Sequence, residues 1–256
     1  MDKKDLKPWQ IVSETLKIVS KRVEPGVTTK ELDELAEKTV LGMSGIPINK
    51  GYKPKFATTP FPATLCTSVN DTVVHGIPNE IPLVGGDIIN LDLGVKKDGQ
   101  CGDAAMMVPV GKISDRDERL IRYAKHIVYE AIKSVKAGVQ IKEISHAIEW
   151  YAKRMGFITN LRFAGHTIGQ EMHEDPMIPN HELPGLGEEI LKVGQRICIE
   201  PMITYKDKWG MLMPDGWTVK TTDGRNSAFF EHMLEVSEDG CKVLTDHFTE
   251  EGETNE

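Results

Sequence analysis

The chain has few cysteines, no long apolar run and no excess of positive charge. Its four cysteines, among 256 residues, are widely spread and form no Cys-x-x-Cys pair, which argues against a disulfide scaffold or a zinc ribbon. No apolar run approaches the ~18 residues that a membrane-spanning helix needs. The net charge is -8, and no cluster of lysine and arginine is interleaved with aromatic residues. We therefore expect no membrane span and no nucleic-acid partner.

Both ends of the chain are polar. The N-terminal sequence MDKKDLKPW is too polar for a signal peptide, and dispersed cysteines fit reduced thiols, so we expect a cytoplasmic protein. The last residues, 249–256, read TEEGETNE and predict a disordered acidic tail. The 256 residues are enough for one large domain or two small ones, with an ample core.

Two segments of the chain resemble each other. VEPGVTTKELDELAEKTVLGMSGI begins at Val23 and VKAGVQIKEISHAIEWYAKRMGFI begins at Val135, with identical residues recurring at one constant offset. In each, a glycine turn leads into an amphipathic helix, and Thr28 with Glu31 makes a capping box in the first. Chance similarity between two amphipathic helices is the alternative to a true repeat.

A further helix is predicted before each of these segments, over residues 9–22 and 118–134, where apolar residues recur at three- and four-residue spacing. The repeated unit is therefore helix, turn, helix, then strands. We interpret the chain as an α+β protein, residues 1–256 forming a single domain with related halves at roughly 1–110 and 111–248. Any active site is expected where the halves meet.

The stretch NLDLGVKKDGQCGD, residues 90–103, carries two aspartates in an apolar setting. The alternation before it is typical of a half-buried strand, and the middle of the stretch predicts a hairpin loop. If Val95 pairs with Gln100, Asp92 lies directly opposite Asp103. Like charges that face each other across a sheet repel, so such a pair needs a shared proton or a cation. We interpret Asp98 as a solvated turn residue.

Other polar side chains sit in similar apolar settings further along the chain. LRFAGHTIGQEMHEDP contains His166 and His173, RICIEPM contains Glu200, and SAFFEHMLEV contains Glu231. Four other histidines are assigned to the surface or to satisfied core positions: His126, His146, His181 and His247.

The residue types predict a dinuclear metal site. Asp92, Asp103, Glu200 and Glu231 carry four negative charges, which two divalent cations would neutralise, and His166 adds one nitrogen. Carboxylates able to bridge, with one imidazole and no thiolate, indicate Mn, Fe, Co or Zn, and the residues do not distinguish among them. An open two-metal site activates water and polarises a carbonyl group, which is the chemistry of hydrolysis.

With those residues in hand, the chain resembles the type I methionine aminopeptidases of the pita-bread fold. The resemblance covers nearly the whole chain and rests on five motifs in the family's order: NDTVVHGIP, NLDLGVKKDGQCGD, AGHTIGQEMHEDP, ICIEPM and SAFFEH. It implies a pseudo-twofold fold around a central antiparallel sheet. It also implies a monomeric enzyme that hydrolytically removes the N-terminal methionine from nascent proteins and peptides, with a metal-bridging water as nucleophile and an association with the ribosome.

The resemblance also implies a role for each metal-site residue. Asp92 corresponds to the bidentate ligand of one metal, and Asp103 and Glu231 to the two bridging carboxylates. His166 and Glu200 then complete the other metal. Glu200 is placed to accept the proton of the attacking water.

The remaining family roles concern the substrate. His173 corresponds to the histidine that hydrogen-bonds the scissile amide and stabilises the tetrahedral intermediate. His75, in VVHGIP, corresponds to the histidine near the following peptide nitrogen. The methionine pocket is expected to be apolar, and four residues fall at its motif positions: Phe61, Cys66, Met172 and Trp217.

The sequence departs from the family pattern at two positions. Thr167 stands where the family usually has glycine, and Phe229 stands two residues before the bridging glutamate, where the family commonly has a polar residue. Both leave substrate scope open. Three alternative functions stay open: an Xaa-Pro peptidase, a metal-free creatinase-like enzyme, and a catalytically inactive binding module. Xaa-Pro peptidases usually have an extra N-terminal domain. The interval from Glu200 to Glu231 is too short for the helical insertion of type II enzymes.

Overall fold

The structure is a computed structural model that describes residues 5–54 and 57–248. The predicted acidic tail, 249–256, lies outside the described residues. Within the described ranges, no helix is both long and apolar enough to cross a lipid bilayer.

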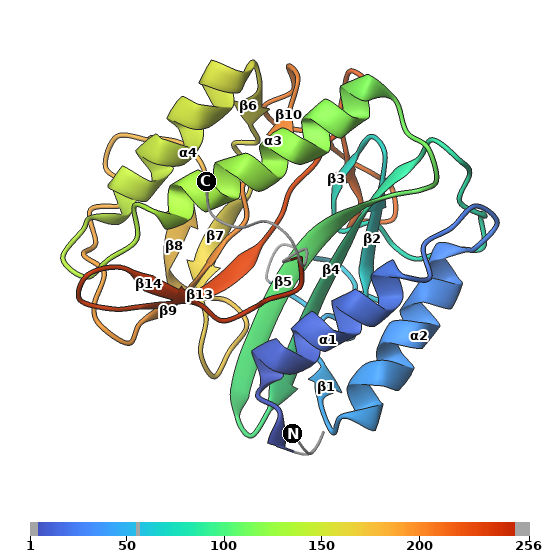
Figure 1. Cartoon of the computed structure of the whole chain (residues 1–256), viewed down its shortest axis with the longest axis horizontal. Coiled ribbons are helices and arrows are strands. Elements are labelled where there is room, and N and C mark those ends of the chain that lie inside the picture. Colours follow the sequence, from blue (N-terminus) through green and yellow to red (C-terminus); the bar gives the residue numbers. More distant parts are fainter. Residues whose placement is uncertain (1–4, 55–56, 249–256) are drawn as a thin grey trace.

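In the described part of the chain, four α-helices form two pairs that cover one face of the sheets (Figure 1). They are α1 (Pro8–Ser20), α2 (Thr29–Gly42), α3 (Asp115–Ile132) and α4 (Ile141–Met155). The pairs confirm the helices predicted from the sequence. The capping box is also present: Glu31 N donates to Thr28 Oγ1, and Thr28 N donates to the Glu31 carboxylate at 2.8 Å.

Two antiparallel sheets lie beneath the helix pairs (Figure 1). In the first, β4 (Ile88–Lys97) pairs with β1 (Ile46–Pro47), β2 (Cys66–Val69) and β5 (Gln100–Pro109). The second has the order β14 (Cys241–Val243), β13 (His232–Val236), β9 (Arg196–Ile199), β7 (Ala164–Thr167) and β8 (Glu174–Pro179). Shorter strands form two small antiparallel groups: β11 (Met211–Leu212), β12 (Val219–Lys220) and β3 (Thr72–Val74), and β10 (Ile203–Thr204) with β6 (Ile158–Thr159).

An isolated antiparallel bridge joins the two large sheets. Ala105 on β5 pairs with Glu231, the residue before β13, and Glu231 N donates to Ala105 O at 2.9 Å. Asn90 adds a second link, because its Nδ2 donates to Phe229 O at 2.9 Å. The sheets therefore continue across the boundary between the halves. The two-halved α+β arrangement is as predicted, while the exact division near residue 110 stays a prediction.

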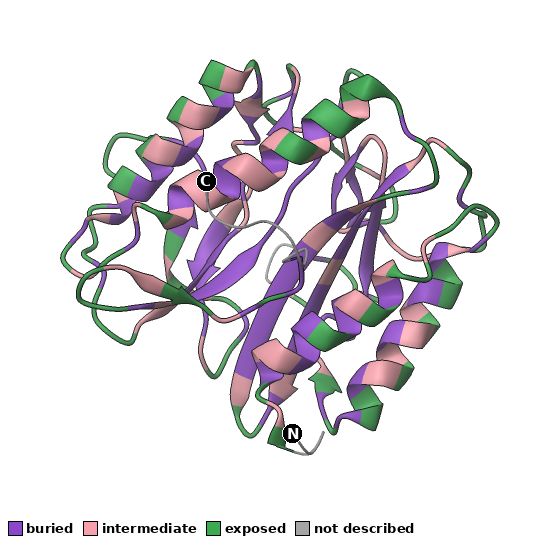
Figure 2. Cartoon of the chain, viewed as in Figure 1, coloured by how far each residue is buried: buried purple, intermediate pink, exposed green. Residues whose placement is uncertain are grey.

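The alternation of strand β4 separates the core from the functional face. Its odd-numbered residues Ile89, Leu91, Leu93 and Val95 are buried in a cluster with α1 and α2. A second cluster lies between α3, α4 and the other sheet. Buried positions, purple in Figure 2, follow the surfaces where helices and sheets meet. Because side chains alternate along a strand, Asp92 projects from the face opposite the helices.

The predicted register of the β4–β5 hairpin was wrong by two residues. Lys97 pairs with Gln100, so the loop is the two-residue turn Asp98-Gly99, and both turn residues have positive φ (51° and 73°). A turn of this kind matches the twist of the flanking strands better than the longer loop that we expected. Asp92 therefore pairs with Ala105, and Asp103 pairs with Gly94. A shift of two residues keeps both aspartates on one face, without placing like charges directly opposite.

Candidate active site

Three strands place three of the predicted ligands on one face of the joined sheets. Asp92 on β4 pairs with Ala105 on β5, and Ala105 forms the bridge with Glu231. Cross-strand partners share a face, so the two carboxylates flank a methyl group. Asp103 is two residues from Ala105 and projects from the same face.

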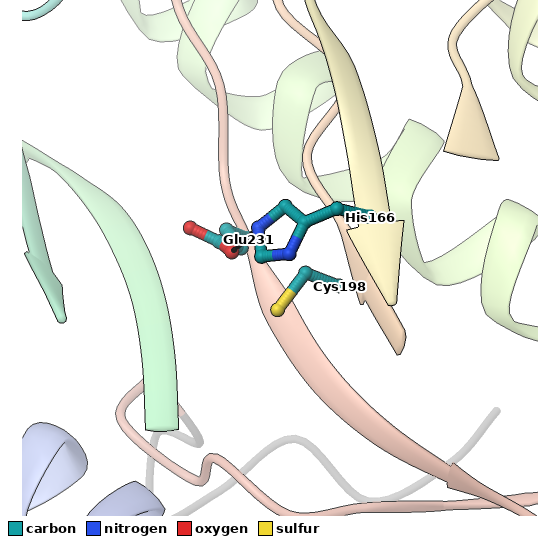
Figure 3. Close-up of side chains that lie close together, drawn as sticks. All are labelled: His166, Cys198 and Glu231. Carbon is teal, nitrogen blue, oxygen red and sulfur yellow. Dashed lines mark ion pairs between the residues drawn. The ribbon is translucent and has the colours of Figure 1, made fainter. Parts of the chain in front are cut away.

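Strands β7 and β9 bring the two remaining predicted ligands, His166 and Glu200, to this face, next to β13. His166 pairs with Cys198, and Cys198 pairs with Met233. Glu200 is two residues after Cys198, and Glu231 is two residues before Met233. Because side chains alternate in extended backbone, both glutamates project from the same face of the sheet as His166. Figure 3 shows the Glu231 carboxylate beside the His166 ring, with the Cys198 thiol below them. One ligand atom from each of these three residues lies within 4.8 Å of the others.

The His166 ring is oriented for ligation. Its Nδ1 lies 3.1 Å from Thr167 O, and a carbonyl oxygen can only accept, so Nδ1 carries the ring proton. The Nε2 lone pair then faces the carboxylates. Its distances are 3.6 Å to Glu200 Oε1, 3.9 Å to Asp103 Oδ2 and 4.0 Å to Glu231 Oε1. A backbone partner on the other ring nitrogen is typical of a histidine that binds a metal.

Burial makes the charged form of these four carboxylates unfavourable. Desolvation raises the pKa of Asp92 to about 7. It also raises the pKa of Asp103, Glu200 and Glu231 well above the usual range, and repulsion among the carboxylates adds to that shift. Bound cations would reverse this preference, because they stabilise the ionised form.

Two buried oxygen atoms support the fit of cations. Asp103 Oδ1 and Glu231 Oε1 have no hydrogen-bond partner among the described residues. Metal-ligand spacing occurs in two groups, Asp92 with Asp103 and Glu231, and His166 with Cys198 and Glu231. The groups share Glu231, as a carboxylate that bridges two ions would be shared, whereas Glu200 belongs to neither group and lies 3.6 Å from His166 Nε2.

The carboxylates line a cavity of about 580 Å³ whose walls are partly apolar. All four predicted pocket residues line it: Phe61, Cys66, Met172 and Trp217. The Phe61 and Trp217 rings meet edge to face, with centroids 5.2 Å apart. Trp217 Nε1 donates to Thr59 O at 3.0 Å, which holds the indole in place. The cavity thus has an acidic end with metal-ligand spacing and an apolar wall.

His75 reaches the cavity from a strained turn. Its φ is 57°, which is uncommon for a residue other than glycine. The next residue must be glycine, because a Cβ on Gly76 would lie 2.2 Å from Thr67 O. Desolvation, with smaller contributions from His173 and Arg162, lowers the pKa of His75 to about 4, so its imidazole is neutral at pH 7. Strain of this kind is typical of a functional position.

His173 lines the same cavity, where its ring is accessible to solvent although protein atoms surround most of it. Desolvation lowers its pKa to about 4. The His173 ring lies 4.3 Å from the His166 ring, centroid to centroid. Its Nδ1 is 2.8 Å from the hydroxyl oxygen of Tyr52, a cavity residue that the sequence analysis missed. Tyr52 lies in a loop without a recognisable motif, so no local signal identifies it.

Cys198 was also missed, although a signal for it existed. It stands two residues before Glu200 in RICIEPM, and strand alternation places the two side chains on one face. The two departures from the family pattern lie outside the cavity lining. Thr167 Oγ1 donates to Pro176 O at 3.0 Å. Phe229 is fully buried in an apolar cluster with residues such as Met202.

Most of the histidines that were assigned to the surface or to satisfied core positions lie where they were expected. His126 and His146 are partly or fully exposed, and His247 is buried with Nε2 3.1 Å from Ala105 O. His181 differs, because it is buried and neither ring nitrogen has a partner among the described residues.

Comparisons with known proteins identify the family. A family model described as metallopeptidase family M24 matches residues 7–238. Methionine aminopeptidase 1 of Bacillus subtilis is 39% identical over 236 residues, 92% of each chain. The methionine aminopeptidase of Aquifex aeolicus is 38% identical over 243 residues, 94% of each chain. The crystal structure of methionine aminopeptidase from Rickettsia prowazekii superposes with a TM-score of 0.88 at 36% identity, covering 93% of this chain and 94% of that one.

The chain therefore belongs to metallopeptidase family M24 and, within that family, to the methionine aminopeptidases. The predicted resemblance and the α+β pita-bread fold are confirmed. Membership in a metallopeptidase family implies that the enzyme uses a divalent metal.

Proposed function

We propose that this enzyme hydrolytically removes the N-terminal methionine from peptides and nascent proteins, with two divalent metal ions bound between its halves. One observation supports the proposal: the five side chains predicted to bind metal line one cavity, together with apolar residues that suit a methionine side chain. Asp92, Asp103, Glu200 and Glu231 supply four negative charges, which balance two divalent cations.

The ligands divide between two positions. Asp92 would hold one ion, His166 and Glu200 would hold the other, and Asp103 and Glu231 would bridge them. Bound there, the ions would supply Lewis acidity and an activated water. Oxygen ligands with one imidazole suit Mn, Fe, Co or Zn.

The chain's own residues would perform the remaining steps. Glu200, within 3.6 Å of His166 Nε2, is placed to take the proton of the attacking water. His173 is neutral and can donate an N–H to the carbonyl oxygen as negative charge develops on it. His75 lines the cavity next to Trp217 and would contact the following peptide nitrogen.

The apolar wall would select methionine. Phe61 and Trp217 offer ring edges, and the Met172 and Cys66 sulfur atoms offer polarisable contacts to a thioether. The rings of Phe61 and Trp217 and the thioether of Met172 offer no charged group to a basic or acidic side chain, so this wall would favour an apolar one.

The cellular setting forms part of the same proposal. The four cysteines are free thiols, which suits the reducing cytoplasm. A monomer that meets nascent chains at the ribosome would have the required substrates, since these chains begin with methionine.

The test is peptide hydrolysis by metal-stripped protein. We would add Mn, Co, Fe(II) or Zn in turn to Met-Ala-Ser and, separately, to an Xaa-Pro peptide, and measure the released free amino acid. We expect metal-dependent release of methionine from the first peptide alone. Cleavage of only the Xaa-Pro peptide, or of neither peptide with any metal, would refute the proposal.

A further inference from the structure

Tyr52 and His173 form a hydrogen-bonded pair on the wall of the cavity. The tyrosine oxygen lies 2.8 Å from His173 Nδ1, and the two rings are 5.2 Å apart at an angle of 41°. The backbone holds Tyr52 in place, because Phe61 N donates to Tyr52 O at 2.9 Å and Tyr52 N donates to Asn49 O at 3.0 Å. The contact therefore joins a loop residue that is hydrogen-bonded at both its backbone N–H and its carbonyl oxygen to a candidate catalytic side chain.

The chemistry of the two groups assigns the direction of the hydrogen bond. A phenol is a stronger acid than a neutral imidazole N–H, so it is the better donor. Burial, with smaller contributions from Asp103 and Glu171, raises the pKa of Tyr52 and keeps its proton in place at neutral pH. A neutral imidazole has one nitrogen that accepts and one that donates. If Nδ1 accepts from Tyr52, the ring proton must be on Nε2.

The neighbouring histidine has the opposite arrangement. His166 Nδ1 donates to the carbonyl oxygen of Thr167, which leaves the Nε2 lone pair for a metal. In His173, Nδ1 has a hydroxyl partner instead, and Nε2 has no hydrogen-bond partner among the described residues. The two imidazole centroids are 4.3 Å apart, and the partner at Nδ1 decides in each ring which nitrogen carries the proton. Nε2 is therefore an acceptor or metal ligand in His166 and a donor in His173.

We propose that Tyr52 is a positioning residue that donates its hydroxyl to His173 Nδ1 and thereby keeps the ring proton on Nε2, the nitrogen that can donate to the substrate's carbonyl oxygen. This inference rests on the proposed aminopeptidase function. Without the hydroxyl, His173 can place its proton on Nδ1, and its Nε2 lone pair would then repel the developing oxyanion.

The first test measures the tautomer directly and does not depend on activity. The Zn-loaded protein, labelled with ¹⁵N at histidine, is compared with Tyr52→Phe, which keeps the ring and removes only the hydroxyl. We expect the ¹⁵N shifts of His173 to report a proton on Nε2 in the native protein and a mixture of tautomers in the variant. A proton on Nδ1 in the native protein would overturn the proposal.

The second test is a double-mutant cycle on methionine release. We expect Tyr52→Phe to lower kcat about 10-fold with KM little changed. His173→Ala should lower kcat about 100-fold. If Tyr52 acts through His173, adding Tyr52→Phe to His173→Ala should cause no further loss. Tyr205→Phe, whose hydroxyl donates to Arg116 O at a distant site, is the matched control.

The outcomes separate this inference from the proposed function. An equal loss from Tyr52→Phe in both backgrounds, or a rise in KM alone, would make Tyr52 a wall of the substrate pocket and refute the positioning role. No methionine release by the native protein would instead refute the proposed function, and the NMR comparison would still decide the tautomer.

Discussion

Asp103→Asn is predicted to have opposite effects on metal binding and on the stability of the metal-free fold. The substitution keeps the shape of the side chain and removes one of four clustered charges. Asp103 is 5% exposed, its Oδ1 has no hydrogen-bond partner among the described residues, and its Oδ2 is 3.9 Å from His166 Nε2. The amide of the variant would remain a weak ligand that cannot bridge two cations effectively.

The expected magnitudes follow from this setting. Loss of a bridging ligand should weaken metal binding by at least about 100-fold, which is the upper end of the effect seen for groups that only support a ligand. The pKa of Asp103 is raised in the folded state by desolvation and by Asp92, so ionisation destabilises the metal-free fold as pH rises above the unfolded value. At pH 8 the metal-free variant should therefore be more stable by about 1–3 kcal/mol. Each kcal/mol corresponds to roughly 2–4 °C in Tm for a chain of this size.

The assays are calorimetric metal titration and thermal unfolding after chelation. Asp98→Asn is the matched control, because Asp98 is an exposed turn residue with a left-handed backbone conformation. Asparagine tolerates that conformation as well as aspartate does. The control should bind metal and unfold as the native protein does. An Asp103→Asn protein that binds two metal ions at native affinity would refute the bridging assignment. A metal-free variant that is less stable than native at pH 8 would refute the argument from buried, mutually repelling carboxylates.

Two further predictions concern pH and packing. Because the folded-state pKa of Asp92 is raised to about 7, the metal-stripped protein should lose stability as pH rises from about 4, the ordinary pKa of an aspartate, to about 7, whereas metal-saturated protein should not. Thermal melts at pH 5 and pH 8 would test this, and a stripped protein that is more stable at pH 8 would contradict it. Gly165→Ala would place a Cβ 2.2 Å from Cys198 O and should separate β7 from β9, abolishing metal binding and lowering Tm, while Gly240→Ala, with no atom within 4 Å, should be neutral by the same two measurements. A Gly165→Ala protein with native Tm and metal affinity would contradict this prediction, because it would show that β7 and β9 accommodate the added Cβ without loss of stability.

The local features of this protein were predictable because they depend on neighbouring residues. Thr28 and Glu31 lie three positions apart, so their capping box forms within one helical turn. The alternation of β4 likewise separates Leu91 and Leu93 from Asp92 within a few residues. Both patterns survive wherever the element lies in the fold, and the recurring motifs made the family recognisable.

Hairpin register was less accessible, because it depends on the turn. The letters KKDG were interpreted as a four-residue loop, although Asp98-Gly99 is itself a signal for a two-residue turn because both residues tolerate positive φ. The aspartates stayed on one face only because the error was an even number of residues.

The sequence by itself determined the types of the candidate ligands, the helix pairs and the alternating faces of β4, since these follow from residue chemistry and local periodicity. Only the tertiary structure decided that Glu231 crosses to Ala105, that Cys198 lies beside His166, and that Tyr52 reaches His173. These contacts join segments far apart in the chain, and no local pattern encodes them. They form because the apolar faces of both halves must be buried together, which brings the charged faces to one cavity.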